Sequence, residues 1–248
     1  MHNCLVGSEM CIRDSMGRVT AVVFDCDGVL TDNGSSWQNI HRKFGTDTAN
    51  DGSHKKTLEM FLDGKITEEE FVEHDIRLWK SVKSDIHKDD IIRCYSGIGL
   101  IDGAREVVDE LKRRGIYVAI VSSGVDLFVG AIANMLKVDD WAANGFVWDE
   151  EGYLVKGLPT RVYSHQKGLM VEKLARINDF ETREIISIGD SSTDLSMKIG
   201  ESSFIGFNPA RARALESFRS AGVPVVESKD LRKIWPYIFD GEEFPDQT

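Results

Sequence analysis

The chain has 248 residues, and its 30 Lys and Arg residues against 41 Asp and Glu residues give a formal net charge of −11 at pH 7. Apolar residues make up 42% and charged residues 29%, which is typical of a globular protein that buries a sizeable core. The acidic balance argues against binding to nucleic acids or anionic membranes, and no stretch is apolar enough to span a membrane. A small molecule is the expected partner, while the oligomeric state stays open.

Residues 1–15, MHNCLVGSEMCIRDS, have neither the basic start nor the apolar run of a signal peptide. Residues 5–15 look like the translation of a transposase adapter from a sequencing library. We therefore interpret 1–15 as a non-native, adapter-derived tail and expect Met16 to be the natural start; a short natural tail is the alternative. Without this segment only Cys26 and Cys94 remain, which predicts neither a disulfide framework nor a zinc site. We expect a reducing, cytoplasmic location.

Short apolar runs alternate with amphipathic stretches along most of the chain. The runs predict strands at 18–24, 116–121 and 185–188, with shorter strands at 204–205 and 223–226, and helices at 104–114 and 167–177. Such alternation predicts right-handed crossovers and a doubly wound, mostly parallel α/β sheet. Turn residues between the apolar flanks of 148–154 predict a β-hairpin.

Residues 33–97 interrupt this alternation. They contain no convincing strand but do contain charged helical stretches at 53–62, 67–81 and 88–94, and Thr67 is a plausible N-cap. Roughly 65 residues are far more than a loop needs. The sequence therefore predicts an α-helical cap over 33–97, inserted into a core domain formed by 16–32 and 98–248.

The strongest chemical signal is the segment from Phe24 to Val29, FDCDGV, at the end of the first predicted strand. Because side chains alternate along a strand, Asp25 and Asp27 face the same way while Cys26 turns toward the core. Ligands of open α/β sheets bind at this edge. Two carboxylates there suit metal binding, nucleophilic attack or acid–base catalysis, although a solvated cap is the plain alternative.

Three further features should reach the same edge. Ser122 and Ser123 end the second strand and offer a hydroxyl and backbone amides for phosphate oxygens, or an ordinary N-cap. Lys167 begins the helix before the third strand, where a lone lysine is usually a surface residue. Asp190 and Asp194 follow the third strand and suit either metal ligation or capping. Their coincidence with the first acidic pair favours a functional site.

The chain resembles the haloacid dehalogenase-like superfamily of phosphohydrolases in an ordered set of residues: Asp25 with Asp27, Ser122, Lys167, and Asp190 with Asp194. The resemblance extends over residues 18–239, and the insert is similar to that superfamily's helical cap of the first type. From Gly97 onward the chain is similar to the phosphoserine phosphatase branch. The resemblance implies a Rossmann-like core with an inserted cap and hydrolysis of a phosphomonoester.

The resemblance also implies roles for these residues. Asp25 would be the nucleophile that forms an aspartyl-phosphate, and Asp27 would protonate the leaving alcohol and then activate water. Mg²⁺ would be held by Asp25, the backbone carbonyl of Asp27 and Asp190, with support from Asp194. The phosphoryl oxygens would be bound by Ser122, the amide of Ser123 and Lys167.

The charges of the predicted site require cations. Asp25, Asp190 and Asp194 carry three negative charges, and a phosphomonoester brings about two more. Like charges 4 Å apart repel by about 4 kcal/mol at an effective dielectric constant near 20. Without Mg²⁺ and Lys167 the substrate would be repelled, so we expect the activity to depend on metal.

The substrate is where the sequence departs from the phosphoserine phosphatase branch. The glutamate that grips the substrate amino group is Gly34 here, and Thr193 replaces the usual Asn before the last acid of the motif. Ungapped alignment through the cap places Leu62, Glu68 and Asp75 where that branch has methionine, phenylalanine and arginine. An aspartate cannot replace an arginine that pairs with a carboxylate. Candidate specificity residues are Ser36, Trp37, His41 and Arg77; alternatively, Trp37 and His41 pack the base of the cap.

The sequence thus predicts a Mg²⁺-dependent phosphomonoester hydrolase that acts on a small phosphorylated metabolite through an aspartyl-phosphate. A phosphoserine phosphatase proper is the alternative within enzymes. A phospho-accepting signalling module or a catalytically silent metabolite binder is the alternative from another class, although a signalling module needs neither Asp27 nor the insert. Capless sugar-acid phosphatases are disfavoured because 97 positions separate Asp25 from Ser122.

Overall fold

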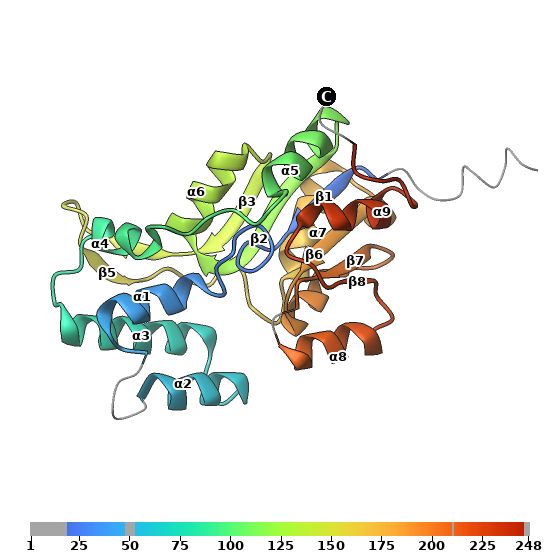
Figure 1. The fold of residues 1–248 in the computed structure, drawn as a ribbon. Coiled ribbons are helices and arrows are strands. Elements are labelled where there is room, and N and C mark those ends of the chain that lie inside the picture. Colours follow the sequence, from blue (N-terminus) through green and yellow to red (C-terminus); the bar gives the residue numbers. More distant parts are fainter. Residues whose placement is uncertain (1–18, 48–52, 210, 246–248) are drawn as a thin grey trace, which may run out of the picture.

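The computed structural model describes residues 19–47, 53–209 and 211–245. The segment interpreted as an adapter-derived tail, 1–15, lies outside these residues. Within them, an α/β sheet carries helices on both faces, and a group of helices from the first half of the chain lies to one side of it (Figure 1).

In the described part of the chain six strands form one parallel sheet in the order β3-β2-β1-β6-β7-β8. Their bounds are β1 Ala21–Phe24, β2 Tyr117–Val125, β3 Asp140–Asn144, β6 Ile185–Gly189, β7 Ser203–Phe207 and β8 Val225–Val226. The apolar run AVVF puts β1 at the centre, where all four of its residues are buried. The predicted doubly wound parallel sheet is confirmed.

The alternating side chains of β1 divide the core into two layers. Val22 and Phe24 belong to a cluster with side chains of α5 and α6, whereas Ala21 and Val23 belong to a cluster with side chains of α7 and α8. The core helices are α5 Ala104–Arg113, α6 Asp126–Leu136, α7 Gly168–Asn178, α8 Ala212–Ser220 and α9 Trp235–Ile238. Short 3₁₀ turns cover η1 Arg93–Tyr95, η2 Thr182–Glu184, η3 Ser192–Met197 and η4 Leu231–Ile234.

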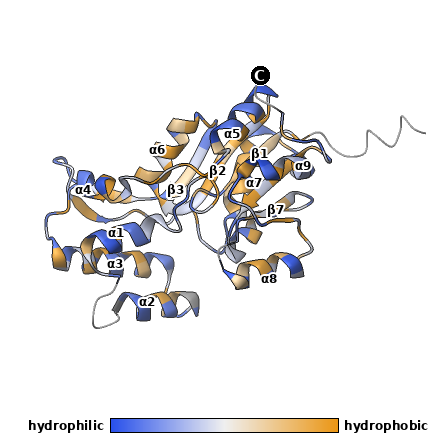
Figure 2. Ribbon diagram, viewed as in Figure 1, coloured by the Kyte–Doolittle hydropathy of each residue, from blue (hydrophilic) through white to orange (hydrophobic). Residues whose placement is uncertain are grey.

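Residues 33–97, predicted to form a cap and called the cap below, contain α1 Ser36–Phe44, α2 Ser53–Leu62, α3 Glu68–Val82 and α4 Lys88–Ile92. Thr67 caps α3 as predicted, because its hydroxyl accepts from the amide of Glu70 while the Glu70 carboxylate accepts from the amide of Thr67. Figure 2 shows hydrophobic and hydrophilic residues on the same cap helices, as expected for helices with one buried face.

The sequence did not predict α1. Its N-cap is Ser35, its end is Gly45 in the left-handed region at φ 67°, and its residue Ile40 is fully buried. These features are typical of a helix. Polar residues surround the short apolar stripe, however, so the hydrophobic periodicity does not reveal it.

The predicted hairpin is confirmed as antiparallel β4 Phe146–Trp148 and β5 Leu154–Gly157. It lies in the range that the sequence assigns to the core, yet Phe146 and Leu154 pack with Trp79 and other side chains of the cap helices. The boundary of the cap at 33–97 stays a prediction. Among the described residues no helix has the length and apolar character needed to cross a membrane.

Candidate active site

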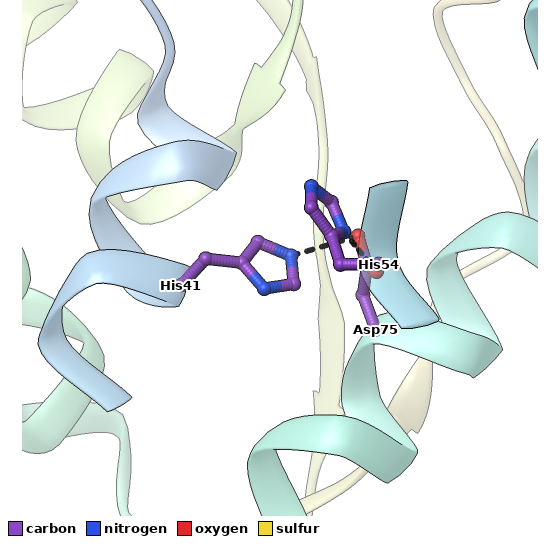
Figure 3. A group of neighbouring side chains, drawn as sticks. All are labelled: His41, His54 and Asp75. Atoms are coloured by element: carbon purple, nitrogen blue, oxygen red, sulfur yellow. Dashed lines mark hydrogen bonds and ion pairs between the residues drawn. The ribbon is translucent and has the colours of Figure 1, made fainter. Parts of the chain in front are cut away.

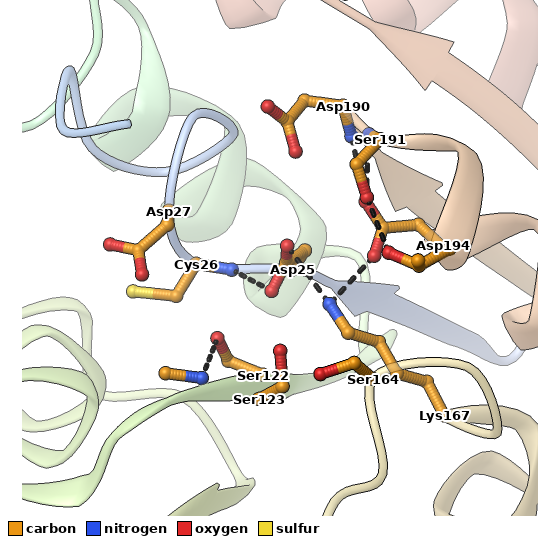
Figure 4. A network of polar contacts seen from close by, with 12 residues as sticks. Asp25, Cys26, Asp27, Ser122, Ser123, Ser164, Lys167, Asp190, Ser191 and Asp194 are labelled. Atoms are coloured by element: carbon orange, nitrogen blue, oxygen red, sulfur yellow. Dashed lines mark hydrogen bonds and ion pairs between the residues drawn. The ribbon is translucent and has the colours of Figure 1, made fainter. Parts of the chain in front are cut away.

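The segment that carries Asp25 and Asp27 lies at the point where the chain changes the direction in which it adds strands to the sheet. Strand β1 lies between β2 and β6, so the segments that follow β1 and β6 meet the end of β2 at one edge. Asp25 follows β1, Ser122 lies near the end of β2, and Asp190 follows β6. The predicted convergence is visible in Figure 4.

Lys167 joins two carboxylates at this edge. Its Nζ lies 3.0 Å from Asp25 Oδ2 and 2.6 Å from Asp194 Oδ1 (Figure 4). All three residues are at most 5% exposed. Burial alone would lower the pKa of Lys167, but the charges of Asp194 and Asp25 outweigh it and raise that pKa above its usual value. The ammonium group is therefore a fixed positive charge beside Asp25.

One lysine does not balance the acids around it. Burial raises the pKa of Asp25 to about 6, because Lys167 offsets only part of the effect while Asp194 and Asp27 add to it. Burial raises the pKa of Asp190 well above its usual value, and Asp194 and Asp25 raise it further. A further cation beside these buried carboxylates would stabilise their charged forms.

Asp27 faces neutral donors instead of a cation. Its Oδ2 accepts hydrogen bonds from the amide and the hydroxyl of Ser36, at 2.9 and 2.8 Å, and its Oδ1 accepts one from Asn33 Nδ2 at 2.8 Å. Burial raises the pKa of Asp27 in spite of these bonds. Asn39 in turn donates to Asn33 Oδ1 at 2.7 Å. The start of α1 thus orients the second aspartate.

Strand β2 continues past its predicted end at Val121, and the irregular stretch from Val121 to Val125 forms a bend in the strand. The register with β3 shifts between Val121 and Val125, and the strand continues through the serine pair. Ser122 is 1% exposed, and its Oγ accepts from the amide of Gly124 at 3.1 Å. A Cβ on Gly124 would lie 2.6 Å from Ser36 Oγ, so the absence of a side chain lets the cap approach this bend.

Two side chains from different segments hold the carbonyl of Ser123. Trp37 donates to it through Nε1 at 2.9 Å, and Asn144 donates through Nδ2 at 3.3 Å. Asn144 also bonds Val162 O at 2.8 Å and accepts from the amides of Arg161 and Val162 at 2.9 and 3.0 Å. This buried asparagine ties the bend to the segment that leads to Lys167. No local sequence pattern marks Asn144 as part of the site.

Asp194 organises its own loop. Its Oδ2 accepts from the amides of Asp190 and Ser191 at 3.1 and 2.9 Å and from Ser191 Oγ at 2.9 Å. With its other oxygen on Lys167, this fully buried carboxylate connects the two halves of the site. Gly28, at φ 77°, lets the first loop come close, because a Cβ there would lie 2.5 Å from Asp190 Oδ2.

The residues present fit a divalent cation of the hard type. Asp25, Asp190 and Asp194 each direct a carboxylate oxygen to one region, where these atoms lie within 4.8 Å of one another. Oxygen donors alone suit Mg²⁺ better than zinc. Three carboxylates around one lysine leave negative charge that such an ion would neutralise.

The predicted specificity residues lie in different places. Ser36 contacts Asp27 directly. Trp37 stacks on Trp79 with ring centroids 6.1 Å apart, and His41 is fully buried, which agrees with the alternative that both pack the base of the cap. Arg77 is 70% exposed and pairs with Glu73 at 4.0 Å, outside the acidic cluster.

The cap positions aligned with the phosphoserine phosphatase branch have other partners here. Glu68 accepts from the amide and hydroxyl of Ser164, at 3.0 and 2.7 Å, and so links the cap to the segment before Lys167. Asp75 is buried among histidines of the cap. The side chain of Leu62 lies outside the described residues.

Proteins similar to this chain include phosphoserine phosphatases. The chain is 28% identical to a phosphoserine phosphatase of Methanocaldococcus jannaschii over 218 residues, which cover 88% of this chain and 96% of that one. A solved substrate-bound phosphoserine phosphatase complex superposes with a TM-score of 0.70 at 26% identity, covering 90% of this chain and 99% of the other. A phospho-aspartyl intermediate analogue of phosphoserine phosphatase gives 0.68 at 28% identity, with coverage of 90% and 100%.

The model of one family matches most of the chain. It spans residues 19–198, from the start of β1 to the loop that carries Asp194, and so includes each acid of the cluster. The family is described as haloacid dehalogenase-like hydrolase. The fold and the order of the motifs agree with this match, and the chain belongs to the haloacid dehalogenase-like hydrolase family.

Proposed function

We propose that the protein is a Mg²⁺-dependent phosphomonoester hydrolase that acts on a small phosphorylated metabolite through an aspartyl-phosphate, in a reducing cytoplasm. The observation that carries the proposal is the contrast between two neighbouring acids. Asp25 lies 3.0 Å from the ammonium group of Lys167, whereas the described partners that donate to Asp27 are neutral. A nucleophile must be ionised, which the lysine favours, and a general acid must hold a proton, which the burial of Asp27 favours against the hydrogen bonds that it accepts.

In the first step a carboxylate oxygen of Asp25 attacks phosphorus while Asp27 gives its proton to the ester oxygen. The bond between phosphorus and that oxygen breaks, and the alcohol leaves. In the second step Asp27, now ionised, takes a proton from water, whose oxygen attacks the aspartyl-phosphate and releases inorganic phosphate. The raised pKa of Asp27 supports its role as the acid of the first step.

The phosphoryl oxygens would be bound by Lys167, Ser122 and the amide of Ser123. Mg²⁺ would be held by Asp25, the carbonyl of Asp27 and Asp190, with Asp194 in support. When bound, the metal supplies positive charge that allows a dianionic phosphate to approach three carboxylates. The other contacts of Asp194 indicate that its main task is to position Lys167 and the loop of Asp190.

Phosphoserine is the second candidate substrate, because the relatives named above are phosphoserine phosphatases. Two features disfavour it. Gly34 offers no side chain to an amino group, and Asp75 is engaged with His41 and His54. A panel of phosphorylated metabolites that includes phosphoserine separates the two candidates.

The direct test is phosphate release by the purified protein with Mg²⁺ and this panel. We expect at least one small phosphomonoester to be hydrolysed, with activity lost on chelation. Asp25→Asn is expected to abolish release while the circular dichroism spectrum is unchanged. Persistent turnover by a folded Asp25→Asn variant would rule out the covalent route.

A further inference from the structure

Three helices of the cap bring metal-binding side chains together away from the acidic site. His41 comes from α1, His54 from α2 and Asp75 from α3, and their side chains point toward one another (Figure 3). His41 is 0% and Asp75 1% exposed, while the His54 side chain is 18% exposed. One ligand atom from each residue lies within 4.8 Å of the others.

The carboxylate of Asp75 is at the centre of this cluster. Its Oδ2 lies 3.0 Å from His41 Nε2, and its Oδ1 lies 3.0 Å from His54 Nδ1 and 3.6 Å from His74 Nδ1. Burial alone would raise the pKa of Asp75, but His41 and His54 outweigh it and lower that pKa. The carboxylate thus faces three imidazoles.

The contact between His41 and Asp75 is short but poorly aligned for a hydrogen bond. Within the described residues His41 Nε2 has no aligned hydrogen-bond partner, although it is buried and 3.0 Å from the carboxylate. Two ligands that each lie about 2.0–2.2 Å from one tetrahedral ion are roughly 3.3 Å apart, and the oxygen then lies off the axis of the nitrogen lone pair. The two atoms are therefore already close to the separation that a shared ion requires.

Nδ1 of His41 has a hydrogen-bond partner in either tautomer of the ring. Trp79 Nε1 donates to Nδ1 at 3.2 Å, which suits a ring that is protonated at Nε2. Thr46 Oγ1 lies 2.7 Å from Nδ1 and can accept a proton from it, while its own hydroxyl faces His41 O at 3.5 Å. Moving the ring proton from Nε2 to Nδ1 frees Nε2 for an ion without changing the charge of the ring.

We propose that His41, His54 and Asp75 bind a Zn²⁺ ion that joins α1, α2 and α3 of the cap. Zinc binds ligand sets of imidazole nitrogens and a carboxylate, whereas Mg²⁺ does not favour nitrogen ligands. A water molecule would complete the tetrahedral set. Because α1 also carries Ser36 and Trp37, the ion would stabilise the helix that orients Asp27 and contacts Ser123.

The test is to measure Zn²⁺ binding to the full chain in excess Mg²⁺. The Mg²⁺ is added to fill the site formed by Asp25, Asp190 and Asp194. Calorimetry should give one Zn²⁺ per chain, and Co²⁺ in its place should show the intense visible bands of a four-coordinate, nitrogen-containing site. Loss of a second-sphere partner weakens metal binding 10- to 100-fold. We therefore expect His54→Gln and Asp75→Asn to weaken Zn²⁺ binding by about 100-fold or more. Zn²⁺ should raise the Tm of the wild type but not of His54→Gln.

The matched control is His87→Asn. His87 lies outside the cluster, where its Nδ1 accepts from Asp89 N at the start of α4, and asparagine retains a capping acceptor. This variant should bind Zn²⁺ like the wild type. His54 is partly exposed, so His54→Gln is expected to keep the wild-type circular dichroism spectrum even if Asp75→Asn does not fold. Equal Zn²⁺ binding by wild type and His54→Gln, or only the weak bands of six-coordinate Co²⁺, would overturn the proposal.

Discussion

At the scale of single residues, Asp25 and Asp27 show that two acids close together in the chain can have different chemical surroundings. They are two residues apart and both are removed from water, which raises the pKa of each. Their partners differ, because Asp25 faces a lysine whereas Asp27 faces an asparagine and a serine. The division of labour that we propose follows from these partners rather than from the carboxylates themselves.

The bonds to Asp27 predict an effect of Ser36 on turnover. In Ser36→Ala the hydroxyl donor to Asp27 Oδ2 is lost while the backbone amide remains, so the acid is less well oriented. We expect kcat for p-nitrophenyl phosphate to fall about 10- to 100-fold, with a smaller change in KM. Ser81→Ala, at an exposed serine of α3, is the control and should match the wild type. An unchanged kcat in Ser36→Ala would contradict the positioning role.

The pKa of Asp190 predicts how stability depends on pH and metal. Because this pKa is raised in the folded protein, the group's contribution to stability is present below its unfolded value near 3.9 and is lost as the pH rises. In EDTA, Asp190→Asn should therefore melt above the wild type at pH 8, and the difference should shrink toward pH 4. Mg²⁺ should raise the Tm of the wild type more than that of the variant. A lower Tm for Asp190→Asn in EDTA at pH 8 would contradict the expectation that burial of the Asp190 charge, with repulsion from Asp194 and Asp25, destabilises the metal-free wild type.

At the scale of elements, five of the six strands described in the core sheet were predictable because their apolar runs must be buried on both faces, whereas β3, whose sequence DWAAN has no such run, was missed. Parallel strands then bring their ends together, so the sequence also indicated that Asp25, Ser122 and Asp190 would meet. The helix α1 and the continuation of β2 through the serines were not predicted, since both depend on polar residues whose partners lie far away in the chain. Asn39, Asn33 and Asn144 act through such contacts and carry no local signal.

Asn144 at the end of β3 predicts a large effect on stability. Asn144→Ala leaves the amides of Arg161 and Val162 without the side-chain oxygen that they share. A buried polar group that loses its partner costs about 1–3 kcal/mol, so we expect the free energy of unfolding in urea to fall by about 2–4 kcal/mol. Asn134→Ala, at an exposed position of α6, should change it by less than about 0.5 kcal/mol. Equal urea midpoints for the two variants would contradict this account of the loop.

At the scale of the whole molecule, the cap and the core share the site. The core contributes the acids, Ser122 and Lys167, while the cap contributes Ser36 and Trp37 through α1 and Glu68 through α3. The hairpin β4–β5 packs with the cap helices although it is part of the second half of the chain. The sequence predicted the existence of an insert but not these contacts, because cap residues that meet the core are dispersed over several helices.

The claim on which the functional account depends is that Asp25 becomes phosphorylated during turnover. The most direct measurement is a rapid acid quench of the enzyme with p-nitrophenyl phosphate and Mg²⁺, followed by mass mapping of its peptides. We predict one phosphoryl group on the peptide that contains Asp25, and none in Asp25→Asn. Turnover with no phosphoryl group on that peptide, or with the group on another residue, would contradict the account.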